Sequence, residues 1–136
     1  MGLIVDSSDV ITAERSGQTA YEMMDRLALR VGGEDLAMSV VTVLELAHGL
    51  ARADTESRRA KRQRFLDDLL VGMPVQTVTV PIALRAGQLH GYLQAVGKGI
   101  PLADLLIGAT ALELGYSVLT ANRRHFDQIP GLKVVG

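Results

Sequence analysis

The sequence contains no cysteine, few prolines and no long apolar run among its 136 residues. The absence of cysteine excludes a disulfide scaffold and any zinc or iron–sulfur site built on thiolate ligands. No stretch approaches the roughly 20 apolar residues that cross a bilayer. The first residues, MGLIVDSSDV, lack the basic start and the longer apolar run of a signal peptide. We therefore expect a cytoplasmic protein without a membrane segment.

Length and composition favour one domain over residues 1–136. A chain of this size buries about two-thirds of the surface that its unfolded form exposes, so it can fold without a disulfide or metal staple. The fourteen glycines and four prolines are scattered along the chain. They form no linker, repeat or low-complexity tract that would divide it.

Short apolar runs alternate with helical patterns along the chain. Strands are predicted at residues 3–5, 36–38, 75–80, 117–119 and 133–135. Helices are predicted through residues 10–13, with Ser7 or Ser8 as the cap, and over 18–31, 40–53, 56–70, 81–97 and 101–114. This alternation is typical of a parallel sheet covered on both faces. The predicted fold is therefore α/β, with three α/β/α layers around a short parallel central sheet.

Three acidic residues stand where the pattern calls for apolar side chains. Asp6 ends the first strand, at the edge where open α/β sheets bind ligands. Glu45 interrupts the apolar run VVTVLELAHGL at 40–50, and Asp104 lies within LADLLIGATAL at 102–112. A lone carboxylate in a buried helix is costly unless a cation or a hydrogen-bond donor meets it. These acids are therefore candidate functional residues.

Each acid also has a structural interpretation. Asp6 could cap the helix that follows it, and Glu45 could close a capping box with Thr42. Asp104 could interact favourably with the dipole of its own helix, because it lies in the first turn. His48, on the same helical stripe as Glu45, is interpreted as a groove or surface residue rather than a ligand.

Isolated carboxylates without cysteine partners favour a hard divalent cation. Mg²⁺ and Mn²⁺ bind carboxylate oxygens and keep several water ligands. A cation between the acids would also relieve their mutual repulsion. Such ions typically act on phosphates, where they activate water and stabilise the pentacovalent phosphorus of phosphodiester cleavage.

One basic segment indicates a polyanionic substrate, although the net charge of the chain is −1. The segment RRAKRQR at 58–64 contains five basic side chains and no acid, namely Arg58, Arg59, Lys61, Arg62 and Arg64. Such a segment can be a solvated helix face, or it can contact the phosphates of a nucleic acid. Together with the carboxylates, it favours a nucleic acid as the substrate.

Four motifs follow one another along the chain: VDSS (5–8), TVLELAHG (42–49), IPLADLLIGATAL (100–112) and LTANRRHF (119–126). In this order they resemble a PIN domain and more narrowly the VapC toxins of bacterial toxin–antitoxin pairs. The resemblance implies a Mg²⁺- or Mn²⁺-dependent endoribonuclease that cleaves structured RNA, such as tRNA or ribosomal RNA. It also implies a homodimer and a cognate VapB-like antitoxin that blocks the site.

The resemblance assigns roles to individual residues. Asp6, Glu45 and Asp104 match the family's catalytic, metal-binding acids, while Ser8 and Thr120 match supporting hydroxyls. Arg123 and Arg124 would bring positive charge near the RNA backbone.

The last motif departs from the family pattern. Many relatives have a fourth acid just before the aromatic residue, where this chain has His125. We expect a three-carboxylate site that Asn122 or His125 completes, with a weaker case for a tightly bound second metal. If His125 lines the site, it should bond a scissile phosphate or a metal-bound water; otherwise it packs beside Phe126. Asp127 is a less suitable substitute, because it is offset by two positions.

Three other functions are weighed against this one. A nucleotide-binding α/β module would need a phosphate loop, and neither G-x-G-x-x-G nor G-x-x-x-x-G-K-[ST] occurs in the chain. A PIN-like DNA nuclease or a phosphatase could carry the same acidic cluster. A catalytically weakened interaction module is compatible with the missing fourth acid.

Overall fold

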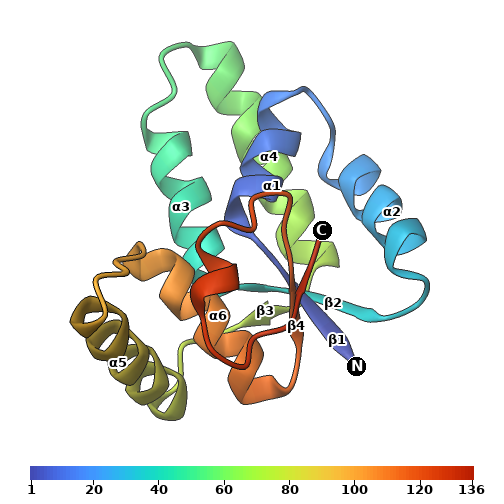
Figure 1. The fold of residues 1–136 in the computed structure, drawn as a ribbon. Coiled ribbons are helices and arrows are strands. Elements are labelled where there is room, and N and C mark those ends of the chain that lie inside the picture. Colours follow the sequence, from blue (N-terminus) through green and yellow to red (C-terminus); the bar gives the residue numbers. More distant parts are fainter.

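The computed structural model describes residues 1–136 as a parallel sheet between two layers of helices (Figure 1). The strands are β1 (Gly2–Val5), β2 (Asp35–Ser39), β3 (Val75–Gln76), β4 (Ser117–Leu119) and β5 (Val134–Val135). The helices are α1 (Ser7–Arg15), α2 (Ala20–Val31), α3 (Val40–Ala51), α4 (Glu56–Gly72), α5 (Val80–Ala95) and α6 (Leu102–Leu114), with a 3₁₀ turn η1 (Phe126–Gln128). The sheet order is β3-β2-β1-β4-β5, and every pair is parallel. The predicted three-layer α/β/α fold is confirmed.

The central strand β1 separates two hydrophobic cores. Leu3 and Val5 belong to the core beneath α1, α2 and α4, whereas Ile4 belongs to the core beneath α6. This division follows from the alternation of side chains along a strand. Figure 1 shows α5 and α6 on the opposite side of the sheet from α1, α2 and α4. Burial of each large apolar side chain in these cores contributes about 1.5–3 kcal/mol to stability.

The sheet register places the ends of three strands at one edge. Leu3 of β1 pairs with Leu36 of β2 and with Ser117 of β4. The segments that leave β1, β2 and β4 therefore emerge side by side. They lead into α1, α3 and the loop after β4, which carry the chemically notable residues.

Most helix ends follow the sequence signals. Thr19 forms a capping box with Glu22 at the start of α2, with bonds of 3.1 and 3.0 Å. Gly32 and Gly115 end α2 and α6 with positive φ values of 62° and 70°, which glycine adopts without strain. No helix of the chain is long and apolar enough to span a bilayer.

Three local predictions are wrong. The strand predicted at 75–80 ends at Gln76, because the Thr79 hydroxyl accepts a bond from Ile82 N at 3.3 Å and caps α5. That helix ends at Ala95 rather than at 97. Neither Ser7 nor Ser8 caps α1, since the helix begins at Ser7 with Asp6 in the cap position. Side-chain capping thus outweighs β-branched propensity at residues 77–79.

Candidate active site

Three acidic side chains from separate elements line one pocket at the carboxyl edge of the sheet. Asp6 lies between β1 and α1, Glu45 lies in α3, and Asp104 lies in the first turn of α6. The pocket encloses about 380 Å³. Asn122 and His125 line it as well, so the structure brings together all five residues predicted to be catalytic.

Hydroxyl groups hold Asp6 in place. Its side chain is 3% exposed, and its Oδ2 accepts hydrogen bonds from Ser8 Oγ and, at 2.9 Å, from Thr120 Oγ1. Asp6 makes no side-chain bond to the backbone of α1. The capping interpretation of Asp6 is therefore wrong, because its carboxylate accepts hydrogen bonds from two hydroxyls and none from the backbone N–H groups of α1.

Glu45 is half-buried and faces the same pocket. Its Oε1 accepts a hydrogen bond from Ser7 Oγ at 3.0 Å. Burial raises the pKa of Glu45, the Ser7 bond opposes this shift, and the nearby charges of Asp104 and Asp6 reinforce it. The alternative interpretation, a capping box with Thr42, is wrong, since α3 begins at Val40 and Thr42 already lies inside the helix.

His125 contacts Asp104 directly. Its Nδ1 lies 2.7 Å from Asp104 Oδ2, and each side chain is 20% exposed. Arg124 lies 3.2 Å from the other ring nitrogen, Nε2. A guanidinium can only donate, so Nε2 is the acceptor and Nδ1 donates its hydrogen to Asp104. His125 thus lines the pocket through a bond to a carboxylate, in addition to its position beside Phe126.

Burial also raises the pKa of Asp104. The His125 hydrogen bond lowers this pKa, while the nearby Asp6 carboxylate raises it. The dipole of α6 can favour an acid in its first turn. It does not account for a raised pKa, because burial is the largest influence on the pKa of Asp104 and acts in the opposite direction.

The loop after β4 carries Asn122 into the pocket. Thr120 Oγ1 accepts a bond from Asn122 N at 2.9 Å, which ties the loop to the hydroxyl that also holds Asp6. Ala121 N donates to both carboxylate oxygens of Asp9, at 3.1 and 3.2 Å. Asp127 instead pairs with Arg123 at 3.3 Å and does not line the pocket.

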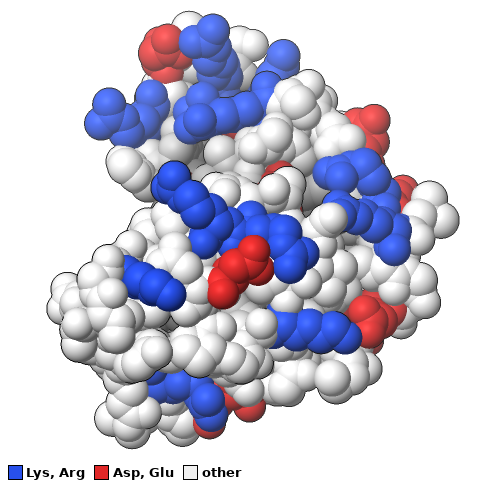
Figure 2. Space-filling view, in the orientation of Figure 1, with Lys and Arg blue, Asp and Glu red and all other residues white.

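Sequence reasoning missed Ser7, Asp9 and Arg15. Arg15 is exposed at the end of α1 and lines the carboxylate pocket. Its spacing of seven residues from Ser8 places both on one helical face, which was the available signal. Figure 2 shows Lys and Arg side chains gathered on the face that carries α1 and the C-terminal loops.

The basic segment lies on α4 and does not line the carboxylate pocket. Arg58 pairs with Asp54 at 2.8 Å, Arg59 donates to Ala53 O at 3.4 Å, and Arg62 donates to Gly49 O at 2.6 Å and pairs with Glu14 at 3.2 Å. Lys61 and Arg64 make no hydrogen bond or ion pair within the chain. The structure therefore divides the five residues into three whose guanidinium groups bond to the protein and two whose charged groups do not.

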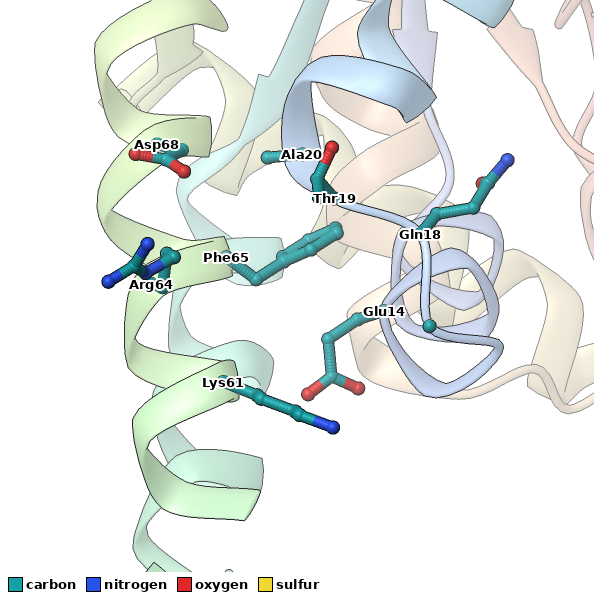
Figure 3. Close-up of a pocket in the computed structure, with 9 residues that line it drawn as sticks. Glu14, Gln18, Thr19, Ala20, Lys61, Arg64, Phe65 and Asp68 are labelled. Carbon is teal, nitrogen blue, oxygen red and sulfur yellow. The ribbon is translucent and has the colours of Figure 1, made fainter. Parts of the chain in front are cut away.

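Lys61 and Arg64 line a separate pocket of about 230 Å³ between α4 and the α1–α2 connection. In Figure 3, the Phe65 ring points into this pocket, and Lys61 and Glu14 extend toward each other at its lower edge. Arg64 points away along the outside of α4. The pocket thus combines an apolar side chain with charges of both signs.

We expect Arg62→Gln to destabilise the fold. Its ion pair with Glu14 is largely buried, at 25% and 12% exposure, and its bond to Gly49 O satisfies the end of α3. The expected loss is about 1–3 kcal/mol of unfolding free energy, measured by urea denaturation. Arg58→Gln is the matched control, because its pair with Asp54 is 62% and 68% exposed. Such exposed pairs contribute little to stability, so equal losses would contradict this assignment.

Comparison with known proteins identifies the family. The sequence model of the PIN domain matches residues 3–132. The chain belongs to the PIN-domain family. It is 34% identical over 131 residues to ribonuclease VapC10 of Mycobacterium tuberculosis, covering 96% of this chain and 91% of that protein. It is also 28% identical over 135 residues to ribonuclease VapC1 of Rickettsia felis, covering 99% and 96%. The predicted resemblance to VapC proteins is confirmed.

Solved structures share the fold. VapBC2 from Rickettsia felis, bound to a DNA fragment from its promoter, matches with a TM-score of 0.84 at 22% identity, covering 99% of this chain and 98% of that chain. FitAcB from Neisseria gonorrhoeae matches with a TM-score of 0.78 at 24% identity, covering 98% and 96%. The arrangement of strands and helices in this PIN domain is therefore found over the whole length of both chains.

Proposed function

We propose that this PIN domain is a Mg²⁺- or Mn²⁺-dependent endoribonuclease, the toxin of a toxin–antitoxin pair. It cleaves structured RNA, such as tRNA or ribosomal RNA, in the cytoplasm. One observation supports this most strongly: Asp6, Glu45 and Asp104, which are far apart in the sequence, line one pocket. The similarity to VapC ribonucleases supports RNA as the substrate.

The chemistry of the pocket fits a hard divalent cation. Two of its three acids have raised pKa values, caused by burial and by mutual repulsion, and a cation would relieve both effects. No three Asp, Glu or His groups are close enough together to hold an ion by themselves. Mg²⁺ is commonly held by one or two carboxylates, while water and substrate phosphate complete its shell. Asp6 and Asp104 are the ligands we propose, with Glu45 beside them.

Different side chains of the pocket have different roles in hydrolysis. A bound Mg²⁺ would supply Lewis acidity toward the scissile phosphate. Glu45, whose raised pKa makes it a better proton acceptor, takes a proton from the attacking water. The water oxygen bonds to phosphorus as the bond to the leaving ribose oxygen breaks, and solvent protonates that oxygen. Asn122 and Arg15, which line the pocket, contact the phosphate oxygens.

Cleavage of purified tRNA and ribosomal RNA tests this proposal. The wild-type chain should cut RNA when Mg²⁺ or Mn²⁺ is present and should lose this activity in EDTA. Cleavage of DNA in preference to RNA would instead assign a DNA nuclease. A chain that cuts neither substrate under any divalent-metal condition would be an interaction module.

The partners we propose are a VapB-like antitoxin and a second copy of the chain. The matched solved structures include VapBC-5 from Mycobacterium tuberculosis, a member of the VapBC family of toxin–antitoxin systems. Co-expression with a VapB-like antitoxin that binds this chain should suppress RNA cleavage. Light scattering of the isolated chain should give the mass of a homodimer, and a monomer would contradict that part of the proposal.

We expect Lys61→Gln combined with Arg64→Gln to weaken RNA binding. These two side chains of the basic segment make no hydrogen bond or ion pair within the chain, so their charged groups are available to phosphates. Each phosphate that loses its cationic partner reduces the salt dependence by about 0.7–0.9 in the log–log slope. A fluorescence-anisotropy titration across several salt concentrations should therefore show a slope flatter by about 1.4–1.8. An unchanged slope would make this part of α4 a solvated face or a protein contact.

A further inference from the structure

A second pocket lies beside the carboxylate pocket, between α1 and α2. It encloses about 330 Å³ and combines the guanidinium groups of Arg26 and Arg30 with the hydroxyls of Thr12 and Ser16. Lys and Arg side chains gather over α2 on the right of Figure 2. Of these four residues, only Thr12 also lines the carboxylate pocket.

The two pockets adjoin along α1. Positions 8, 11, 12 and 15 face the carboxylate pocket, and positions 9, 12, 13 and 16 face the α2 pocket. Successive helix residues are about 100° apart, so these sets are neighbouring faces, and Thr12 belongs to both. Ala121 lines the second pocket, while the next residue, Asn122, lines the first. An extended ligand that crosses Thr12 would occupy both pockets.

The charged groups of the second pocket favour an anion. Arg26 uses one donor, to Gln18 Oε1 at 3.3 Å, and Arg30 makes no hydrogen bond or ion pair within the chain. Since a guanidinium has five N–H donors, most remain available to a ligand. Asp9 is the one acid in the lining, and both of its oxygens accept from Ala121 N. Two arginines and one aspartate leave the lining net positive.

The apolar residues of the lining are almost fully buried. Met23, Leu27 and Ala13 are 1%, 2% and 4% exposed, so they offer a ligand little apolar surface. The guanidinium groups are therefore the main binding groups, and such planar groups bind phosphate in bidentate fashion. Because the carboxylate pocket adjoins this one, a backbone phosphate of the same RNA strand fits this pocket better than a free anion does.

We propose that this pocket binds the phosphate of an RNA nucleotide next to the scissile phosphate. Arg26 and Arg30 contact this neighbouring phosphate. The two arginines are thus positioning residues that hold the strand across α1 at Thr12. This inference rests on the proposed ribonuclease function.

The test changes both arginines to glutamine in the full chain and measures cleavage of purified tRNA with Mg²⁺. We expect KM to rise about tenfold or more, as for the loss of a charge-assisted hydrogen bond, while kcat changes less than twofold. The salt slope of RNA binding should flatten by about 0.7 for each phosphate that an arginine no longer neutralises. Each arginine is also changed singly, so poor folding of the double variant leaves two independent measurements.

Two further variants separate a local effect from a general loss of charge. Lys98→Gln with Lys133→Gln removes the same charge, but neither residue lines this pocket or the carboxylate pocket, so KM should stay close to the wild-type value. Asp9→Asn keeps an acceptor for Ala121 N and removes the one opposing charge. It should lower KM by about two- to fivefold, the range of a single exposed charge.

The outcomes distinguish this inference from the function on which it rests. A wild-type chain that cleaves no RNA overturns both. A wild-type chain that cleaves RNA, with KM and salt slope unchanged in the Arg26/Arg30 variants, overturns the phosphate pocket alone. Weaker antitoxin binding in these variants, with RNA binding unchanged, would also overturn it, because the pocket would then belong to the protein partner.

Discussion

Replacing Asp104 by Asn is expected to abolish RNA cleavage while leaving the fold intact. Asp104 lines the carboxylate pocket and is one of its two proposed metal ligands. Loss of a ligand removes several kcal/mol of transition-state stabilisation by the cation. Because each 1.36 kcal/mol is a factor of ten, the rate should fall by about a thousandfold or more. Asparagine keeps the side-chain shape, and its Oδ1 can still accept the bond from His125.

The same substitution should not destabilise the metal-free protein at neutral pH. Burial raises the pKa of Asp104, so the folded state holds its proton more tightly than the unfolded state does. The resulting stabilisation is complete below the unfolded pKa and is lost as pH rises through the raised folded pKa. In EDTA at pH 7, Asp104→Asn should therefore melt at or above the wild-type temperature, and this difference should disappear in acid.

The effect of Mg²⁺ on the melting temperature is the second measurement for Asp104→Asn. A ligand that binds only the folded state raises its stability with concentration, so Mg²⁺ should raise the wild-type melting temperature and raise that of Asp104→Asn much less. Asp127→Asn is the matched control, because Asp127 lies outside the pocket and pairs with Arg123 on the surface. An Asp104→Asn variant that cuts RNA at the wild-type rate would eliminate the metal site.

The sequence could predict the three acids because each one violates the pattern around it. Asp104 interrupts an otherwise apolar helix, and Asp6 follows a buried strand. The parallel strand order then requires the ends of β1, β2 and β4 to meet at one edge. The hydrophobic periodicity of the sequence therefore predicts most of the strands and helices, and the parallel strand order places these acids near one another.

The remaining contacts depend on tertiary packing that no local pattern encodes. Ser7 and Glu45 are 38 residues apart, and Asp9 and Ala121 are 112 residues apart. Similarly, Arg62 has the same sequence character as its basic neighbours, yet it alone pairs with Glu14. Which member of a charged segment contacts the protein is decided by the neighbouring helix, and that helix is distant in sequence.

His125 gives the second large expected effect, because it occupies the position of the common fourth acid. Its Nδ1 donates to Asp104 Oδ2, so it orients a proposed metal ligand. Loss of such an outer partner typically costs 10- to 100-fold in metal affinity or activity. His125→Ala should therefore lower the cleavage rate by about 10- to 100-fold. His125→Asn, whose side-chain amide can donate from nearly the Nδ1 position, should recover much of this loss.

His125→Asp should lower the melting temperature in EDTA but strengthen the binding of Mn²⁺. In EDTA a carboxylate would replace the donor beside Asp104, and two carboxylates at hydrogen-bond distance repel each other. The melting temperature should therefore fall below that of the wild type and of His125→Asn. With Mn²⁺ present the added acid becomes a further oxygen ligand, so Mn²⁺ should bind more tightly, as measured by calorimetry.

The variants of His125 distinguish two roles for this residue, namely packing beside Phe126 and orienting Asp104. A residue that merely packs beside Phe126 would give equal Mn²⁺ affinities in the Ala, Asn and Asp variants, and equal cleavage rates in the first two. A residue that orients Asp104 gives rates in the order wild type, Asn and Ala, while Asp alone strengthens Mn²⁺ binding. Equal rates for the wild type and His125→Ala would leave Asn122 as the group that completes the site, because it is the remaining polar residue that the β4 loop places in the pocket.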